Sequence, residues 1–242
     1  MKAVVINGSP HGDKGNTQLI LGPFIEGMRA AGAEVKVFET RAMTVQPCQG
    51  EYACWFRTPG QCFQDDDMQK LLPELLEANV LVLATPLYVD GMTGPLKMVV
   101  DRMIPLGEPT IVSRGDHCRH PGRGSVKDRK MVLVSNCGFW ELDNFDALVA
   151  HVKAIAKNLD AEFAGALLRP HGPAFKAMLD QRAPVTDVLD AARDAGRQLV
   201  EQGSIASQTL GVIGRPLLPR DMYVAIANQK MPKPRKQADN RQ

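Results

Sequence analysis

Short polar side chains and glycines gather near the start of the chain, where their spacing suits the binding of a phosphate. Residues 2–7 are mostly apolar, residues 8–17 contain Gly, Ser, Pro, Asn and Thr, and the following stretch has apolar residues at helical spacing. This order predicts a strand, a polar loop and a helix whose N-terminus carries unpaired N–H donors and partial positive charge. A phosphate suits such a terminus, and the short side chains of Ser9, Asn16 and Thr17 can reach its oxygens.

Other residues of this loop are compatible with the same use. Gly12 and Gly15 allow close approach of the backbone, and His11 and Lys14 can add positive charge. The alternative is an ordinary helix N-cap. The loop has neither the G-x-G-x-x-G pattern of dinucleotide sites nor the G-K-[ST] ending of a Walker loop. We therefore expect the phosphate of a different kind of ligand.

Apolar runs alternate with amphipathic stretches along the rest of the chain. Strands are predicted at residues 33–38, 80–84, 131–135 and 162–168, and helices from residues 65 and 95 and over residues 143–158 and 184–202. This alternation predicts a doubly wound parallel sheet, in which ligands lie beyond the carboxyl ends of the strands. Residues 104–129 and the chain from residue 204 onward show no regular pattern. The loops at residues 8–17, 85–94 and 136–141 are expected at one edge of the sheet.

The amino-acid composition limits the classes of protein to which this chain can belong. The 242 residues are 44% hydrophobic and 23% charged, which suits one α/β domain with extensions. A net charge of +2 and 5% aromatic residues give no indication of nucleic acid as a partner. No apolar run approaches the length of a membrane span, and the chain begins with a strand rather than a signal peptide, so we expect a cytoplasmic protein without a membrane partner.

Several of these motifs occur together in one known family. They are Gly8-Ser9-Pro10, Gly15-Asn16-Thr17, Thr85-Pro86-Leu87-Tyr88 with Gly91 and Lys97, and Asp101-Arg102. In combination they resemble the flavodoxin-like NAD(P)H-dependent FMN reductases, particularly the iron–sulfur flavoprotein branch. The resemblance covers roughly residues 1–200. It implies a flavodoxin-like, doubly wound, five-stranded parallel sheet with helices on both faces and a C-terminal extension.

The resemblance also implies a domain division and a set of cofactor contacts. Residues 1–203 would form the FMN-binding domain, with a cysteine-containing insertion at 40–64, and residues 204–242 a C-terminal arm with a flexible basic tail. The residues expected to hold the FMN phosphate are Ser9, Pro10, His11, Asn16 and Thr17. Those expected along the flavin ring are Pro86, Leu87, Tyr88, Gly91, Asn136, Cys137, Gly138 and Phe139. No catalytic side chain is expected, because hydride chemistry belongs to the flavin.

The cysteines depart from the pattern of that branch, which has four clustered ligands for a [4Fe–4S] cluster. Here Cys48, Cys54 and Cys62 stand at positions that match this pattern, but Glu51 stands where the second cysteine is expected. We therefore expect no cluster and no metal. The alternative is a cluster or a zinc ion held by three thiolates and a weaker fourth ligand, for which Cys118 is a further candidate. The odd total of five cysteines argues against a disulfide framework.

The function implied is an FMN-dependent NAD(P)H oxidoreductase that passes electrons to a quinone, a flavin or another small acceptor. A homodimer or homotetramer is expected, with the C-terminal arm as a candidate contact. The alternatives are a non-enzymatic flavin electron carrier, a genuine iron–sulfur flavoprotein, and a flavodoxin-like module that has lost FMN. Asp101 and Arg102 are expected to form a structural ion pair, and His151 and His171 are expected to be structural.

Overall fold

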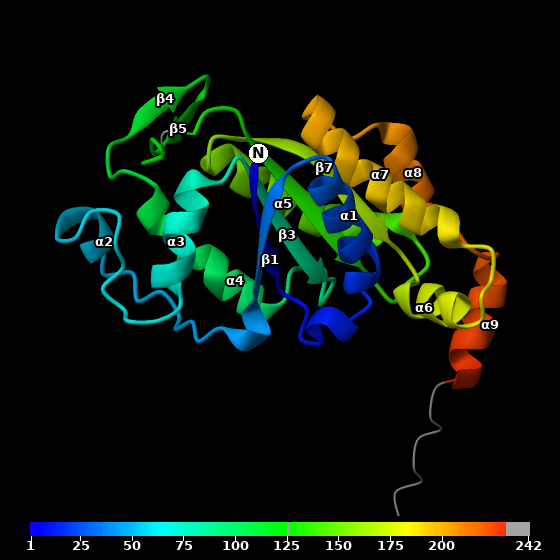
Figure 1. The fold of residues 1–242 in the computed structure, drawn as a ribbon. Helices are drawn as coiled ribbons and strands as arrows, with labels where there is room; N and C mark the ends of the chain where they lie inside the picture. Colours follow the sequence, from blue (N-terminus) through cyan, green and yellow to red (C-terminus); the bar gives the residue numbers. More distant parts are fainter. Residues whose placement is uncertain (125, 231–242) are drawn as a thin grey trace, which may run out of the picture.

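A five-stranded parallel sheet forms the centre of the molecule (Figure 1). The computed structural model describes residues 1–124 and 126–230. The strands follow the order β2-β1-β3-β6-β7, which confirms the predicted doubly wound sheet. Their bounds are Lys2–Asn7 (β1), Glu34–Glu39 (β2), Val80–Pro86 (β3), Arg129–Asn136 (β6) and Ala161–Arg169 (β7).

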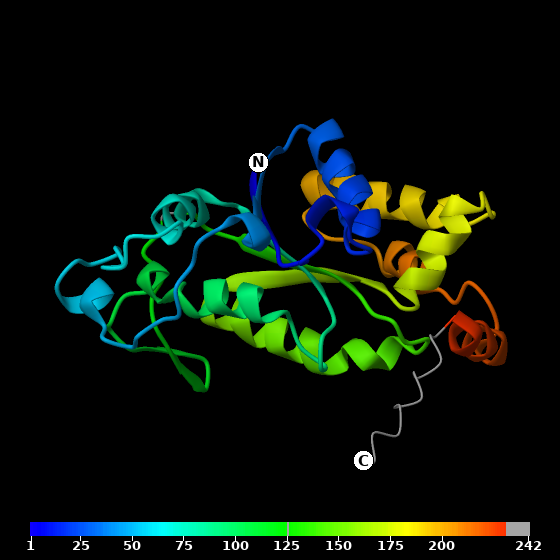
Figure 2. The same cartoon turned by 90° about the horizontal axis from the view of Figure 1, so that it is seen from below.

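Helices cover both faces of this sheet. The helices are α1 (Gln18–Ala30), α2 (Ala53–Phe56), α3 (Met68–Glu77), α4 (Gly94–Asp101), α5 (Asp146–Asn158), α6 (Gly172–Asp180), α7 (Thr186–Gln202), α8 (Ser207–Gly214) and α9 (Arg220–Lys230). Figure 2 shows α1 and α7 on one side of the sheet and α4 and α5 on the other. The alternation of side chains along a strand explains the two layers, because Ala3 and Val5 pack toward α1 and α7 whereas Val4 and Ile6 pack toward α3 and α4. All seven residues of β3 are buried, as expected for a strand covered on both faces.

Two glycines let α1, which follows the polar loop, lie directly on α7. A Cβ atom at Gly27 would overlap the carbonyl oxygen of Arg193, and one at Gly196 would overlap the carbonyl oxygen of Phe24. The two backbones therefore touch at these positions, which fixes the direction of α1 and the place of its N-terminus.

The structure differs from the sequence prediction in segments that lack a strong pattern. The stretch expected to be irregular, residues 104–129, contains the antiparallel hairpin of β4 (Val112–Arg114) and β5 (His117–Arg119). The C-terminal region forms α8 and α9, and Ile213 of α8 is fully buried in the core beside α7. The predicted flexible basic tail lies almost entirely at residues 231–242, outside the described part of the chain. Short strands and helices of this kind depend on tertiary contacts more than on local propensity.

Candidate functional site

The carboxyl ends of β1, β3 and β6 meet at one edge of the sheet. The three strands are neighbours, with Asn7 opposite Ala84 and Pro86 opposite Asn136. The loops that follow them are the three loops singled out from the sequence. They are therefore adjacent in space, as the topology of a doubly wound sheet requires.

The first loop presents backbone donors at the start of α1. The N–H groups of His11, Asn16 and Thr17 have no acceptor among the described residues. Gly15 lies against Ser9, and a Cβ atom there would approach the Ser9 Oγ atom to 2.5 Å, so only glycine fits without a shift. Unpaired N–H groups at a helix N-terminus are the arrangement that binds a phosphate.

The side chains of this loop divide into buried and exposed groups. Ser9 and Thr17 are almost completely buried, Asn16 is half-buried, and Pro10 and His11 are exposed to solvent. Asn7, at the end of β1, is also buried, and its Nδ2 atom has no partner among the described residues. This orphaned donor beside the loop is one the sequence prediction missed.

Asn136 joins the three loops. Its Oδ1 atom accepts a hydrogen bond from Thr17 Oγ1 at 2.6 Å, and its carbonyl oxygen accepts one from the Leu87 N–H at 2.8 Å. The first loop is also tied to the second, because Thr93 Oγ1 donates to the carbonyl oxygen of Gly8 at 2.8 Å. These bonds span up to 119 residues of sequence and hold the loops in a fixed arrangement.

The second loop ends in a tight turn. Tyr88 and Gly91 exchange two backbone hydrogen bonds of 3.0 and 3.1 Å, and the residues between them, Val89 and Asp90, have φ of 47° and 58°. Two successive positive φ angles define a type I′ turn, which disfavours a β-branched residue. The Tyr88 ring beside the turn is 49% exposed, whereas Pro86 is buried and Leu87 is half-buried. An exposed aromatic ring and an apolar neighbour can contact a flat ligand.

The third loop combines a buried thiol with an exposed ring. Cys137 is buried, its Sγ atom lies 3.4 Å from the carbonyl oxygen of Phe139, and burial raises the pKa of the thiol. The thiol is therefore protonated at neutral pH and is no nucleophile. Phe139 is 67% exposed, and the carbonyl oxygen of Gly138 accepts a hydrogen bond from the Tyr223 hydroxyl of α9.

Two buried basic residues behind the third loop were not predicted to bear on the site. The Arg169 guanidinium and the His171 ring are both fully buried, and the backbone N–H of His171 donates to the carbonyl oxygen of Phe139 at 2.6 Å. Burial, together with the nearby positive charge of Arg215, lowers the pKa of Arg169 to about 10. Burial, together with the nearby positive charge of Arg169, lowers the pKa of His171 to about 4. His171 is therefore neutral at pH 7 and Arg169 is charged, and no sequence motif indicated either environment.

A family model matches the part of the chain that contains the first and second loops. Residues 1–135 match the family described as NADPH-dependent FMN reductase. The chain belongs to this family. The resemblance seen in the sequence is thereby confirmed.

Individual relatives agree with the family assignment. The chain is 35% identical over 102 residues to an iron–sulfur flavoprotein of Archaeoglobus fulgidus, covering 42% of this chain and 48% of the relative. It is 32% identical over 106 residues to an iron–sulfur flavoprotein of Methanocaldococcus jannaschii, covering 44% and 53%. The chain thus spans about half the length of these curated relatives.

Solved structures share the fold at low sequence identity. An FMN-dependent NADH-azoreductase from Bacillus anthracis superposes with a TM-score of 0.58 at 19% identity, over 84% of this chain and 99% of that one. An NAD(P)H:quinone oxidoreductase from Methanothermobacter marburgensis gives a TM-score of 0.57 at 18% identity, over 82% and 96%. These similarities show that the chain has the flavodoxin-like fold.

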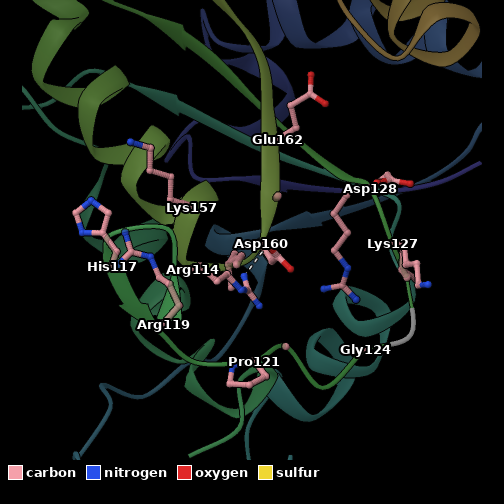
Figure 3. A pocket seen from close by; sticks show the side chains of 15 residues that line it. Arg114, His117, Arg119, Pro121, Gly124, Lys127, Asp128, Lys157, Asp160 and Glu162 are labelled. Atoms are coloured by element: carbon pink, nitrogen blue, oxygen red, sulfur yellow. Dashed lines mark ion pairs between the residues drawn. The ribbon is translucent and has the colours of Figure 1, made fainter. Parts of the chain in front are cut away.

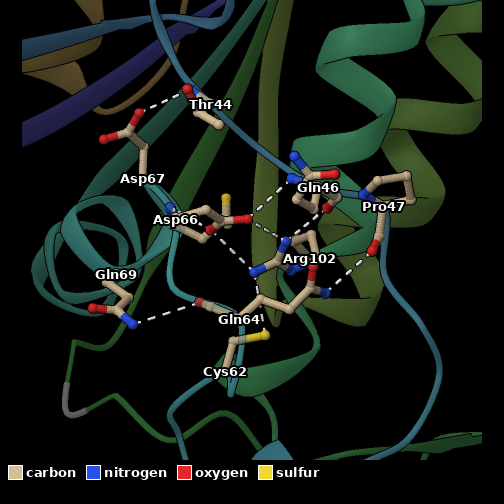
Figure 4. A network of polar contacts seen from close by, with 10 residues as sticks. Thr44, Gln46, Pro47, Cys62, Gln64, Asp66, Asp67, Gln69 and Arg102 are labelled. Atoms are coloured by element: carbon tan, nitrogen blue, oxygen red, sulfur yellow. Dashed lines mark hydrogen bonds and ion pairs between the residues drawn. The ribbon is translucent and has the colours of Figure 1, made fainter.

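The cysteine segment is anchored by a buried ion pair (Figure 4). The Arg102 guanidinium donates to Asp66 Oδ2 at 2.7 Å and to the carbonyl oxygen of Gln46 at 2.6 Å, and both charged side chains are almost completely buried. Arg102 also donates to Cys62 Sγ at 3.2 Å. The predicted pair of Asp101 with Arg102 is wrong. Asp101 projects to solvent and pairs with Lys97, one helical turn away, while Arg102 points into the cysteine segment.

The candidate metal ligands surround a cavity of only about 10 Å³. Cys48, Cys54, Cys62 and Glu51 line it, and Cys118 does not. Within residues 1–124 and 126–230, no three His, Cys, Asp or Glu side chains are placed to hold a metal ion.

A larger cavity of about 930 Å³ lies at the opposite end of the sheet, beside the first residues of β6 and β7 (Figure 3). Basic side chains, among them Arg119, Lys127 and Lys157, line it together with acidic ones such as Asp160, which pairs with Arg114 at 2.6 Å. Because ligands of doubly wound sheets lie at the carboxyl edge, this cavity is separate from the three loops.

No helix in the described part of the chain is long and apolar enough to cross a membrane.

Proposed function

We propose that this chain binds FMN at the carboxyl edge of its sheet and oxidises NAD(P)H. The observation that carries the proposal is the set of unpaired N–H groups of His11, Asn16 and Thr17 at the start of α1. The orphaned Nδ2 atom of Asn7 beside the loop also fits a bound phosphate. Membership of the FMN reductase family supports the same cofactor.

The roles of the residues follow from their exposure and chemistry. The first loop would hold the FMN phosphate, and the exposed rings of Tyr88 and Phe139 would lie along the flavin. FMN, when bound, supplies the hydride and electron chemistry. In the net reaction NAD(P)H gives up a hydride and becomes NAD(P)⁺, and the acceptor takes up two electrons with protons from the donor and the solvent. This net reaction needs no side chain of the protein as a general base.

Binding of FMN is tested by visible spectroscopy with a matched pair of glycine variants. Gly15→Ala places a methyl group against Ser9, whereas Gly94→Ala, at the first residue of α4, meets nothing within 4 Å. We expect FMN bands to shift on binding to the wild type, about tenfold weaker binding in Gly15→Ala, and binding within about twofold of wild type in Gly94→Ala. Riboflavin, which lacks the phosphate, should not distinguish the two variants. Absence of any shift at high FMN concentration would refute the proposal.

Anaerobic addition of NADH or NADPH to the FMN-loaded protein tests the reaction itself. Bleaching of the flavin absorbance supports an oxidoreductase. Retained FMN that neither nucleotide bleaches would instead support the alternative of a non-enzymatic flavin electron carrier.

We further propose that the cysteine segment holds no [4Fe–4S] cluster. Glu51 Oε2 accepts hydrogen bonds from the Ala53 N–H at 2.8 Å and from Arg57 at 3.3 Å, so the carboxylate is already engaged. The space enclosed by Cys48, Cys54 and Cys62 is only about 10 Å³, which is too small for a cluster in this arrangement. Iron and sulfide analysis after anaerobic purification and reconstitution should find neither in stoichiometric amount. One cluster per chain, with its broad absorbance, would contradict this.

A further inference from the structure

The cavity of about 930 Å³ at the amino ends of β6 and β7 is enclosed by three segments of the chain. The hairpin of β4 and β5 forms one wall, the turn between α5 and β7 forms a second, and the segment that leads into β6 forms a third. The ion pair of Arg114 with Asp160 joins the hairpin to that turn. The cavity is therefore a built part of the fold, and its volume falls in the range of small-molecule sites.

The lining of this cavity carries more cations than carboxylates. Two of its three carboxylates are already neutralised, Asp160 by Arg114 and Glu162 by Lys130, which lies outside the lining. Among the described residues, the other four cations of the lining have no carboxylate partner. These unpaired cations are Arg119, Lys127, Arg129 and Lys157, and the one unpaired carboxylate is Asp128. Such an excess attracts anions.

Arg129, the first residue of β6, is a partly buried cation without a counter-ion. Its Nη2 atom donates to the carbonyl oxygen of Leu76 at 2.5 Å, whereas its buried Nε atom has no partner in the described part of the chain. The backbone of Gly124 packs directly on the guanidinium, since a Cβ atom there would lie 2.2 Å from Nη2. Burial lowers the pKa of Arg129, and no carboxylate opposes this effect. An anion bound beside Arg129 would compensate the buried charge and so stabilise the folded chain.

The cations are distributed across the cavity rather than gathered at one point. Figure 3 shows the pair of Arg114 and Asp160 near the middle, with Arg119 on one side and Lys127 on the other. The carboxylate of Glu162 points away from this pair. A single phosphate group would meet few of these side chains, whereas a chain of phosphates can span them. Guanidinium groups suit phosphate oxygens in particular, because their N–H groups can bind two oxygens at once.

We propose that this cavity is a second ligand site, which binds a small molecule with two or more phosphate groups. Nucleotides and inorganic polyphosphates share this chemistry. The site lies at the amino edge of the sheet, opposite the three loops proposed to hold FMN. Both ligands can therefore be bound at the same time, and the assignment does not depend on the proposed function.

Calorimetric titration of the full chain tests the site with inorganic triphosphate, orthophosphate and ATP. We expect one triphosphate to bind per chain, orthophosphate to bind at least tenfold more weakly, and saturating FMN to leave the triphosphate affinity within about twofold. Tighter binding of ATP than of triphosphate would identify a nucleotide as the ligand, and equal binding would identify the phosphates alone. Competition between FMN and triphosphate would instead place the triphosphate in the first loop and overturn the assignment.

Two lysines of α5 provide a matched pair of variants. Lys153 and Lys157 are both exposed and lie one helical turn apart, but only Lys157 lines the cavity. Lys157→Gln should weaken triphosphate binding about fivefold or more, and Lys153→Gln should leave it within about twofold of wild type. Equal losses in the two variants would show that the chain attracts triphosphate only through its general surface charge, which would overturn the proposal.

The two arginines of the lining test the site from its other walls. Arg129→Gln removes the cation without a counter-ion and should weaken triphosphate binding at least tenfold, with urea unfolding used to confirm that the variant is folded. Arg119→Gln, on the hairpin, makes no contact with the core strands and should weaken binding about tenfold. Unchanged affinity in Arg119→Gln and Lys157→Gln, or no binding of triphosphate at millimolar concentration and low salt, would refute the site.

Discussion

Arg169 is a buried cation that is stabilised by carbonyl groups. Its guanidinium donates to the carbonyl oxygens of Pro170 at 2.9 Å, Ile213 at 2.6 Å and Arg215 at 2.6 Å. No carboxylate lies within hydrogen-bonding distance of it in the described part of the chain. The carbonyl dipoles replace water around the charge, so Arg169 ties β7 to the start of the C-terminal arm.

The neighbouring His171 makes stability depend on pH. Its Nε2 atom accepts hydrogen bonds from the Leu217 N–H and from Arg169, both at 3.2 Å, and the rings of Trp140 and Tyr223 cover it. Because its pKa falls from 6.5 to about 4 on folding, the unfolded chain binds a proton in this interval that the folded chain does not. The contribution of neutral His171 is complete above pH 6.5 and is lost as the pH falls toward 4.

We expect this group to remove about 3 kcal/mol from the free energy of unfolding between pH 7 and pH 4. Urea unfolding of wild type and His171→Gln at several pH values measures it, since the carboxylates common to both proteins cancel in the difference. Parallel pH dependences of the two proteins would contradict a lowered pKa of His171.

Val89 holds a strained backbone conformation at the candidate site. Its φ of 47° is unfavourable for a β-branched residue, and its side chain is fully exposed, so no packing compensates. Asparagine tolerates this region of φ and ψ better. Val89→Asn should therefore raise the free energy of unfolding by about 1 kcal/mol, measured by urea unfolding. The control Val37→Asn, on strand β2, should not stabilise the protein, and a loss of stability in Val89→Asn would show that the turn is not strained.

At the level of elements, the cysteine segment is held by Arg102 at the end of α4 and Asp66 at the start of α3. Asp66 also accepts hydrogen bonds from the N–H groups of Gln46 and Met68, both at 3.0 Å. Burial alone would raise the pKa of Asp66, but Arg102 and these N–H groups outweigh it, so the pKa is lowered. The segment is therefore anchored by a buried ion pair and by backbone hydrogen bonds to the same carboxylate.

Removal of one partner of this buried pair should be costly. Arg102→Met leaves the Asp66 carboxylate buried without its cation, and we expect a loss of about 3–5 kcal/mol in the free energy of unfolding. Lys97→Met, which breaks the exposed pair with Asp101, should change it by less than about 1 kcal/mol. Equal effects of the two substitutions in chemical unfolding would rule out Arg102 as the anchor.

At the level of the whole molecule, the segment after β6 and the helix α9 both carry exposed apolar side chains. Phe139 and Leu142 follow β6, and Met222 lies on α9, which is tied to the same loop; these three side chains are 67%, 49% and 54% exposed. Exposed apolar groups on segments that are bonded to each other are a feature of contact surfaces. We therefore propose that two copies of the chain associate through this edge.

Sedimentation equilibrium of the full chain should find a dimer. Met222→Glu places a charge in the proposed contact and should weaken dimerisation about tenfold or more. Val37→Glu, on the edge strand β2, should leave association unchanged. A monomer at high concentration, or equal association in both variants, would exclude this surface.

The sequence by itself determined the sheet, the three loops and the family. Apolar runs such as residues 80–84 and the glycines of residues 8–17 act through local sterics and burial, which the order of residues encodes directly. The sequence also located the irregular cysteine segment, and it placed Glu51 where the resemblance leads one to expect the second cysteine. The cofactor contacts inferred for the three loops remain predictions, although the structure places the loops together.

Tertiary structure alone decided the partners of the buried polar groups. The pair of Arg102 with Asp66, the bond of Thr17 with Asn136 and the bond of Arg169 to the carbonyl oxygen of Ile213 join residues 36 to 119 positions apart. The short helices α6, α8 and α9, and the cavity that α6 and α9 form with the third loop, likewise depend on packing between distant segments. Such contacts depend on where distant segments meet in space, and neither residue spacing nor local propensity records that.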